Sequence, residues 1–135
     1  MSDIIKVCLD KVLPPELERL ATDLAVRENP ANAPRSTRPP FELAAEVRFM
    51  WRPGSTLNVR FLGGHPAVHE KVEHYAHQWE QHANIKFRFV KAGPAHIRVA
   101  FIIGEGSWSY LGTQALVYSD PQIPTMNYGW LEPNT

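Results

Sequence analysis

An α+β fold is predicted, with a twisted mixed sheet of about five strands, one long crossover helix and an N-terminal helix. Several short segments carry apolar residues at every second position, which is typical of half-buried strands. Two longer segments carry them every three or four positions, which is typical of amphipathic helices. Only one of these helices stands between two strands, and this order indicates a single right-handed crossover.

The first 40 residues are predicted to form a leader arm. An apolar strand or extended stretch covers residues 4–9, and a helix follows Pro14-Pro15, because proline is tolerated in the first turn of a helix. Asn29-Pro30 ends this helix. Four prolines up to Pro40 then favour a polyproline-like tether, which would separate the arm from a body of residues 41–135.

The body opens with residues 41–50, for which no structure is predicted, and a turn at 51–55. A strand is predicted next, in which Leu57, Val59 and Phe61 alternate with polar residues. A long amphipathic helix is predicted from Pro66 to Ala83. The later strands have no helices between them, so we expect them to pair as neighbours or antiparallel partners. They are predicted at 85–90, 96–103, 115–118 and 125–131, with a glycine-rich loop at 104–112.

Composition excludes several classes of function. Hydrophobic residues make up 44% and charged residues 21% of the 135 residues, a balance typical of globular domains. The 14 basic and 14 acidic residues cancel, so a nucleic-acid partner is not expected. No apolar run suits a membrane span and no signal peptide is recognisable, which makes a cytoplasmic location the default expectation. The single cysteine, Cys8, excludes an internal disulfide.

The spacing of the histidines does not favour a metal site. His69 and His74 are five positions apart, which would place their imidazoles about 140° apart on a helix and keep them from sharing a metal. His74 and His77 share the solvent side of the predicted helix, where an adventitious zinc site is the alternative to an ordinary polar surface. No serine nucleophile with a histidine–acid pair is recognisable either. We therefore expect no catalytic residue and no tightly bound metal in this chain.

Cys8 is open to two interpretations. As a thiolate it could bind zinc, and Asp10, two residues further on, could also hold a metal. Alternatively, Cys8 is a small buried apolar residue of the first strand, which is the more frequent role.

Two segments in the second half carry a more specific pattern than the rest of the chain, and a segment of the leader adds to it more weakly. The three segments, in chain order, are Lys6-Val7-Cys8-Leu9-Asp10-Lys11-Val12-Leu13-Pro14, Gly106-Ser107-Trp108-Ser109-Tyr110-Leu111-Gly112-Thr113 and Pro124-Thr125-Met126-Asn127-Tyr128-Gly129-Trp130-Leu131. In this order they resemble the leader and upper subdomain of metzincin-type zinc metallopeptidases, which are related to astacins and matrixins. The resemblance covers nearly the whole chain and implies a zincin-like upper subdomain.

The resemblance also implies what is missing. The family carries the motif His-Glu-x-x-His-x-x-Gly-x-x-His on the next helix, where three histidines bind zinc and the glutamate acts as general base. This sequence lacks the motif, and we expect it to stop just before it. The chain is therefore interpreted as the non-catalytic half of a zinc-dependent endopeptidase, inactive alone. The alternative is a stand-alone peptide-binding or interaction module derived from that fold.

By the same resemblance, two regions have expected roles in the complete enzyme. Cys8, or failing it Asp10, would be a latency ligand of the catalytic zinc. A predicted edge strand would align a peptide or protein substrate along the cleft, through Ala115, Leu116, Val117 and Tyr118.

Overall fold

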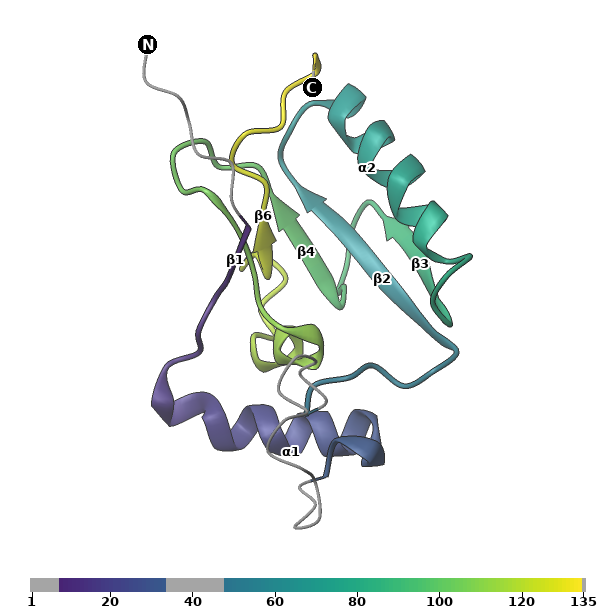
Figure 1. Ribbon diagram of the computed structural model, residues 1–135. Coiled ribbons are helices and arrows are strands. Elements are labelled where there is room, and N and C mark those ends of the chain that lie inside the picture. Colours follow the sequence, from purple (N-terminus) through teal and green to yellow (C-terminus); the bar gives the residue numbers. More distant parts are fainter. Residues whose placement is uncertain (1–7, 34–47, 135) are drawn as a thin grey trace.

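The computed structural model describes residues 8–33 and 48–134 and places them around one mixed sheet (Figure 1). The predicted α+β class is confirmed, with one helix crossing the sheet and an N-terminal helix at its end. No helix in these ranges is long and apolar enough to span a membrane. The strands are β1 (Cys8–Asp10), β2 (Ser55–Leu62), β3 (Ile85–Val90), β4 (Ile97–Ala100), β5 (Ser107–Ser109) and β6 (Met126–Asn127). The helices are η1 (Pro15–Leu17), α1 (Glu18–Glu28), η2 (Pro30–Asn32), α2 (Pro66–Trp79) and η4 (Gly112–Val117).

The six described strands lie in the order β1-β5-β6-β4-β2-β3. β2 pairs in parallel with β3 and β4, and β4 pairs in parallel with β6. β5 runs antiparallel to β6, and β1 runs parallel to β5. α2 links β2 to β3, as the strand–helix–strand pattern predicted. The sheet therefore ends in β1, from the start of the chain, on one side and in β3 on the other.

Local sequence explains β2 and α2. On β2, Leu57 and Val59 are 2% and 4% exposed and alternate with less buried polar residues. α2 begins at Pro66, and the preceding His65 accepts a hydrogen bond from the Ala67 N–H at 3.0 Å through its side chain. The helix ends at Trp79 rather than at the predicted Ala83, because the chain enters turns before β3.

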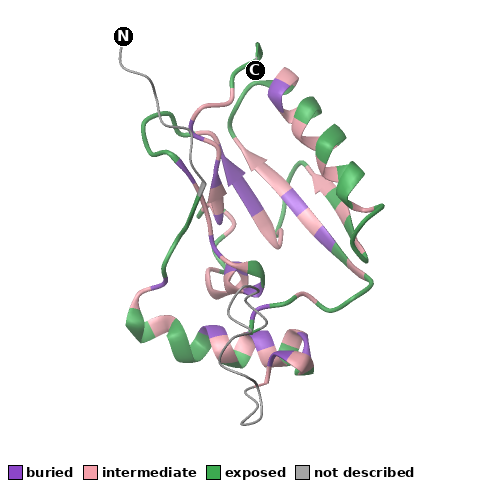
Figure 2. Cartoon of the chain, in the orientation of Figure 1, coloured by how far each residue is buried: buried purple, intermediate pink, exposed green. Residues whose placement is uncertain are grey.

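The leader helix packs on the body at the end of the sheet. α1 lies against η4, and Figure 2 shows buried residues on both. Ala21 and Ala25 of α1 are 1% and 0% exposed and join Leu13, Phe49 and Tyr110 in one buried cluster. The start of the predicted first strand, the boundary at residues 40–41 and most of the predicted tether lie outside the described residues.

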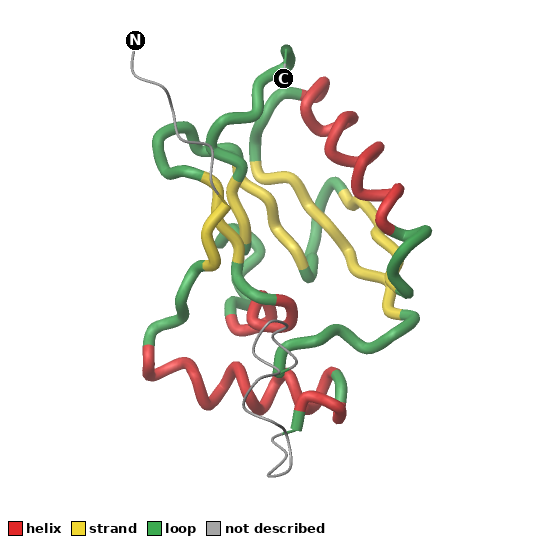
Figure 3. Tube along the Cα trace, viewed as in Figure 1, coloured by secondary structure: helices red, strands yellow, loops and turns green. Residues whose placement is uncertain are grey.

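The strand predicted at Ala115 to Tyr118 is wrong. Residues Gly112–Val117 form η4, a short 3-10 helix, which Figure 3 shows as a coil below the sheet. The Gln114 side chain accepts a hydrogen bond from the Leu111 N–H at 3.0 Å, and the Thr113 N–H donates to the Phe49 carbonyl at 3.0 Å. These contacts hold the backbone in a helical turn, which outweighs the strand preference of Val117 and Tyr118.

The glycine-rich segment contains a strand that the sequence did not predict. Residues Ser107–Ser109 form β5 between β1 and β6. The predicted strand at 125–131 is reduced to Met126–Asn127, because beyond it the chain bends close to the glycine-rich segment. A Cβ on Gly129 would lie 2.5 Å from the Gly106 carbonyl oxygen, so only glycine fits there.

Candidate functional site

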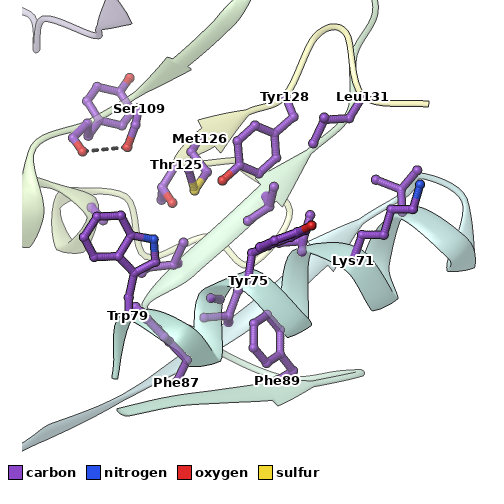
Figure 4. Close-up of a pocket in the computed structure, with 18 of the residues that line it drawn as sticks. Lys71, Tyr75, Trp79, Phe87, Phe89, Ser109, Thr125, Met126, Tyr128 and Leu131 are labelled. Carbon is purple, nitrogen blue, oxygen red and sulfur yellow. Dashed lines mark hydrogen bonds between the residues drawn. The ribbon is translucent and has the colours of Figure 1, made fainter. Parts of the chain in front are cut away.

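An apolar groove lies between α2 and the sheet (Figure 4). Its volume is about 630 Å³. The sheet residues Val59 and Val99, which form one side, are 4% and 2% exposed. Most other lining residues are apolar or aromatic as well, and they come from α2, β3, η4 and the segment around β6. We call this hollow the α2 groove.

Two large aromatic side chains of α2 remain exposed at the groove. Tyr75 is 62% and Trp79 is 66% exposed, although both lie on the apolar stripe of an amphipathic helix. In Figure 4 they face Tyr128 and Met126 of the last strand region across the open space. By contrast, Val68, on the same helix, is 3% exposed. The outer part of the groove therefore lacks the cover that such side chains usually have.

Few polar groups reach the groove, and two of them are hydrogen-bonded to backbone carbonyls. The Lys71 ammonium donates to the Pro133 carbonyl at 2.8 Å. The Ser109 hydroxyl donates to the Tyr110 carbonyl at 2.8 Å (Figure 4). The arrangement suits packing of an apolar surface better than acid–base chemistry, which needs titratable groups facing a substrate.

The histidines on α2 and beside it are engaged in local structure. The His69 ring donates to the Gly63 carbonyl at 2.6 Å and stacks on Phe61 with 4.2 Å between ring centroids. His77 donates to the Glu80 carboxylate at 2.9 Å, and Gln78 donates to His74 at 3.2 Å. Within residues 8–33 and 48–134, no three His, Cys, Asp or Glu side chains are grouped closely enough to hold a metal ion.

The leader strand covers one side of β5. Cys8 lies opposite Ser107 and Asp10 opposite Ser109 in the register of β1 and β5. The Lys11 N–H extends the pairing by donating to the Ser109 carbonyl at 2.8 Å. The Lys11 ammonium lies 3.9 Å from the centroid of the Trp108 ring, a cation–π contact. Asp10 is exposed, and the latency role predicted for Cys8 or Asp10 remains a prediction.

The residues predicted to bind substrate lie in η4 and directly after it, rather than on a strand. Ala115 is 4% exposed and lines the α2 groove from η4. Tyr118 follows η4, and its ring lies 5.5 Å from that of Tyr110. Burial, together with the hydrogen bond to Tyr118, raises the pKa of Tyr110 to about 12. The predicted contact of substrate with Ala115, Leu116, Val117 and Tyr118 stays a prediction. The edge strand from which it was inferred is not present, since these residues lie in and after η4.

Sequence reasoning identified the apolar face of α2 but missed the uncovered groove. The helical spacing of Val72, Tyr75, Ala76 and Trp79 was the available signal. It showed which side chains turn inward but not how much of them would stay exposed. The pairing of β1 with β5 could not be predicted from any local pattern, because the two strands lie far apart in the sequence.

Comparison of the chain with solved structures supports a likeness to part of a metallopeptidase. The solved structures similar to the chain include two of myroilysin. One is 48% identical over 64% of this chain and 41% of the myroilysin chain, with a TM-score of 0.61. The other is 35% identical over 96% of this chain and 51% of the myroilysin chain, with a TM-score of 0.62. No family model and no curated protein matches the chain. The chain thus spans about half the length of the solved structures that it matches.

Proposed function

We propose that this chain is the non-catalytic half of a zinc-dependent endopeptidase, and that the α2 groove receives a helix from the catalytic half. The uncovered groove is the observation that carries the proposal. The likeness to myroilysin, a metallopeptidase of which the chain spans about half, supports it.

The size and chemistry of the groove suit an apolar helix face. A volume of about 630 Å³ corresponds to about one and a half turns of a helix 10 Å wide. Tyr75 and Trp79 would lose their exposure on such packing, and each large side chain covered contributes about 1.5–3 kcal/mol. Covering them would also remove an apolar surface that favours aggregation.

Zinc belongs, in this proposal, to the complete enzyme. A catalytic zinc activates a bound water and polarises the scissile carbonyl, and it needs three protein ligands that converge on one point. The described residues do not fit this requirement, because no such group of His, Cys, Asp or Glu is present among them. We therefore assign the ligands and the general base to the catalytic half, and this chain to substrate alignment and support.

The β1–β5 edge supports a role in handling peptides. An extended peptide can add to a sheet edge through backbone hydrogen bonds. β5 is antiparallel to β6, and its other side is occupied by β1 of the leader. In the proposal, a peptide or protein substrate takes the place of β1, and Ala115 to Tyr118 contact its side chains. Cys8, or failing it Asp10, is then the proposed latency ligand that keeps the leader in place.

Reconstitution from two halves tests the proposal. The chain is mixed with a polypeptide that corresponds to the half of myroilysin outside the match, and cleavage of a denatured protein is measured with zinc and with a chelator. We expect chelator-sensitive cleavage from the mixture and none from either half. Trp79→Asp should abolish it, whereas Arg19→Glu on exposed α1 should not. Cleavage by the chain alone, or a mixture that is inactive although the two halves bind, would contradict the proposal.

One observation favours the alternative of a stand-alone binding module. The cluster of Leu13, Ala21, Ala25, Phe49 and Tyr110 gives the leader and the body a shared core. Such a core could support cooperative folding of this chain without a second half. A single cooperative melting transition, together with weak binding of an apolar dye, would favour this alternative. Strong dye binding and aggregation would favour the half-enzyme.

A further inference from the structure

The face of the sheet opposite α2 carries a group of cations at the β3 side. Side chains alternate along each strand, so Arg60 of β2 and Lys86 and Arg88 of β3 project on the side away from the α2 groove. Lys86 lies opposite Thr56, Arg88 lies opposite Asn58, and Arg60 is the diagonal neighbour of Arg88. Lys86 and Arg88 are exposed. We call these three cations the β3 basic row.

Within the described residues, no salt bridge joins a carboxylate to the β3 basic row. The pKa of the Glu80 carboxyl is lowered first by the hydrogen bonds from Phe87 and His77, and Lys86 lies near enough to add to this lowering. Arg60 donates to the Gly93 carbonyl at 3.2 Å, which holds its side chain without neutralising the charge. Like charges close together on one sheet face destabilise the sheet. An anionic partner would therefore bind more favourably here than at an isolated surface lysine.

The backbone edge beside this row offers hydrogen-bonding groups. β3 is the last strand of the sheet and pairs only with β2 among the described strands (Figure 1). The Phe87 N–H points away from β2 and donates to the Glu80 carboxylate at 2.6 Å. Because backbone groups alternate in direction, Ile85 and Phe89 also turn their N–H and C=O groups outward. A carboxylate of the chain itself thus already sits on this edge.

The spacing of the cations and the edge favours one kind of partner. Lys86 and Arg88 are two positions apart on a strand, which separates them by about 6.6 Å. A peptide strand paired with β3 would place its own alternate side chains at the same spacing on the same face. We propose that the β3 edge binds an extended acidic peptide, whose backbone pairs with β3 and whose alternate carboxylates meet Lys86 and Arg88.

Peptide titration followed by amide NMR tests this inference. The probe is an acetylated octapeptide of alternating Thr and Glu, and its matched control carries Lys in place of Glu. We expect shifts at residues 84–91 with the acidic peptide and none with the basic one. Lys86→Glu combined with Arg88→Glu should weaken binding at least about tenfold. Arg19→Glu, a single charge reversal on α1, should not change it.

Further measurements separate strand addition from other anion binding. Glu80→Ala frees the Phe87 N–H and removes a competing charge, so we expect tighter binding of the acidic peptide. Equal binding of polyphosphate, without shifts of the Ile85, Phe87 and Phe89 amides, would show a general anion surface and overturn the inference. Shifts confined to the α2 groove or the β1–β5 edge would overturn it too. The inference would also be overturned if the acidic peptide did not bind and the Lys86 and Arg88 double variant associated with itself. In that case the cations would serve only to prevent β3 edges of two copies of the chain from pairing.

Discussion

Asn32 pairs with Met50 through both ends of its side-chain amide. The Asn32 Oδ1 accepts the Met50 N–H at 2.9 Å, and its Nδ2 donates to the Met50 carbonyl at 2.9 Å. The same Nδ2 donates to the Ala25 carbonyl at the end of α1 at 3.0 Å. Asn32 is 1% exposed, so one buried side chain joins the leader helix to the chain that leads into β2.

Replacement of Asn32 should therefore destabilise the whole domain. Asn32→Ala removes one buried and two partly buried hydrogen bonds and leaves backbone groups of Ala25 and Met50 without these partners. We expect the free energy of unfolding to fall by about 2–4 kcal/mol, measured by urea denaturation. Asn29→Ala is the matched control, because the Asn29 side chain makes two longer bonds, a donation of 3.2 Å to the Trp51 carbonyl and an acceptance of 3.1 Å from the Ala31 N–H, and its loss should cost less. Equal losses for the two variants would contradict this account.

The exposed aromatic residues of the α2 groove should contribute little to the stability of the isolated chain. We expect Trp79→Ser to change the free energy of unfolding by no more than about 0.5 kcal/mol and to reduce binding of an apolar dye clearly. Val68→Ala, at a buried site of the same helix, should instead cost about 2 kcal/mol. A large loss of stability in Trp79→Ser would mean that the indole is covered in solution.

Arg98 organises the loop before β6. Its guanidinium donates to the carbonyls of Ala95, Tyr118 and Ile123 at 2.8, 2.6 and 2.5 Å, and burial lowers its pKa. Arg98→Met leaves these carbonyls without a donor and should cost about 3 kcal/mol. Amide exchange should accelerate mainly in residues 118–125. Arg88→Met, at an exposed position, should leave exchange there unchanged, and an equal effect in both variants would refute the role of Arg98.

Alkaline pH should destabilise the fold through Tyr110. Its pKa is raised to about 12, first by burial and then by the hydrogen bond with Tyr118. The unfolded chain loses this proton near pH 10, about the ordinary value of tyrosine, so the folded state alone retains it between these values. Stability from this group is complete below pH 10 and is lost as the pH rises toward 12.

Tyr110→Phe should therefore flatten the decline of stability above pH 10, measured by denaturant unfolding at several pH values. Tyr75→Phe, at an exposed position on α2, provides the control and should keep the decline of the unmodified chain. If the stability of Tyr110→Phe declined above pH 10 as much as that of the unmodified chain, titratable groups other than Tyr110 would cause the decline.

The predictable part of the fold was the part with local periodicity. Leu57, Val59 and Phe61 identify β2 because a two-residue alternation follows from a sheet with one buried face. The spacing of Val68, Val72 and Trp79 identifies α2 in the same way. The helix η4 could not be predicted from the sequence, because the hydrogen bond from the Thr113 N–H to the Phe49 carbonyl forms only when these two distant segments come together.

The candidate site shows the same limit. The helical spacing indicated which α2 residues face the sheet, but the exposure of Tyr75 and Trp79 depends on what else covers that face. The β3 basic row could be predicted only in part from the sequence. Alternation along one strand places Lys86 and Arg88 on one face, whereas the position of Arg60 beside Arg88 depends on the register of β2 and β3. Pairwise register of parallel strands is a tertiary property that no single segment encodes.

The pairing of β1 with β5 has a consequence for the order of events during synthesis. Cys8 and Ser107 are register partners about one hundred residues apart, and contacts of such separation form slowly because a long loop must close first. The leader leaves the ribosome first, yet its strand has no place in the sheet until residue 109 has been made. Leu13, which is buried in one cluster with Tyr110 in the folded chain, stays without that cover throughout the same interval.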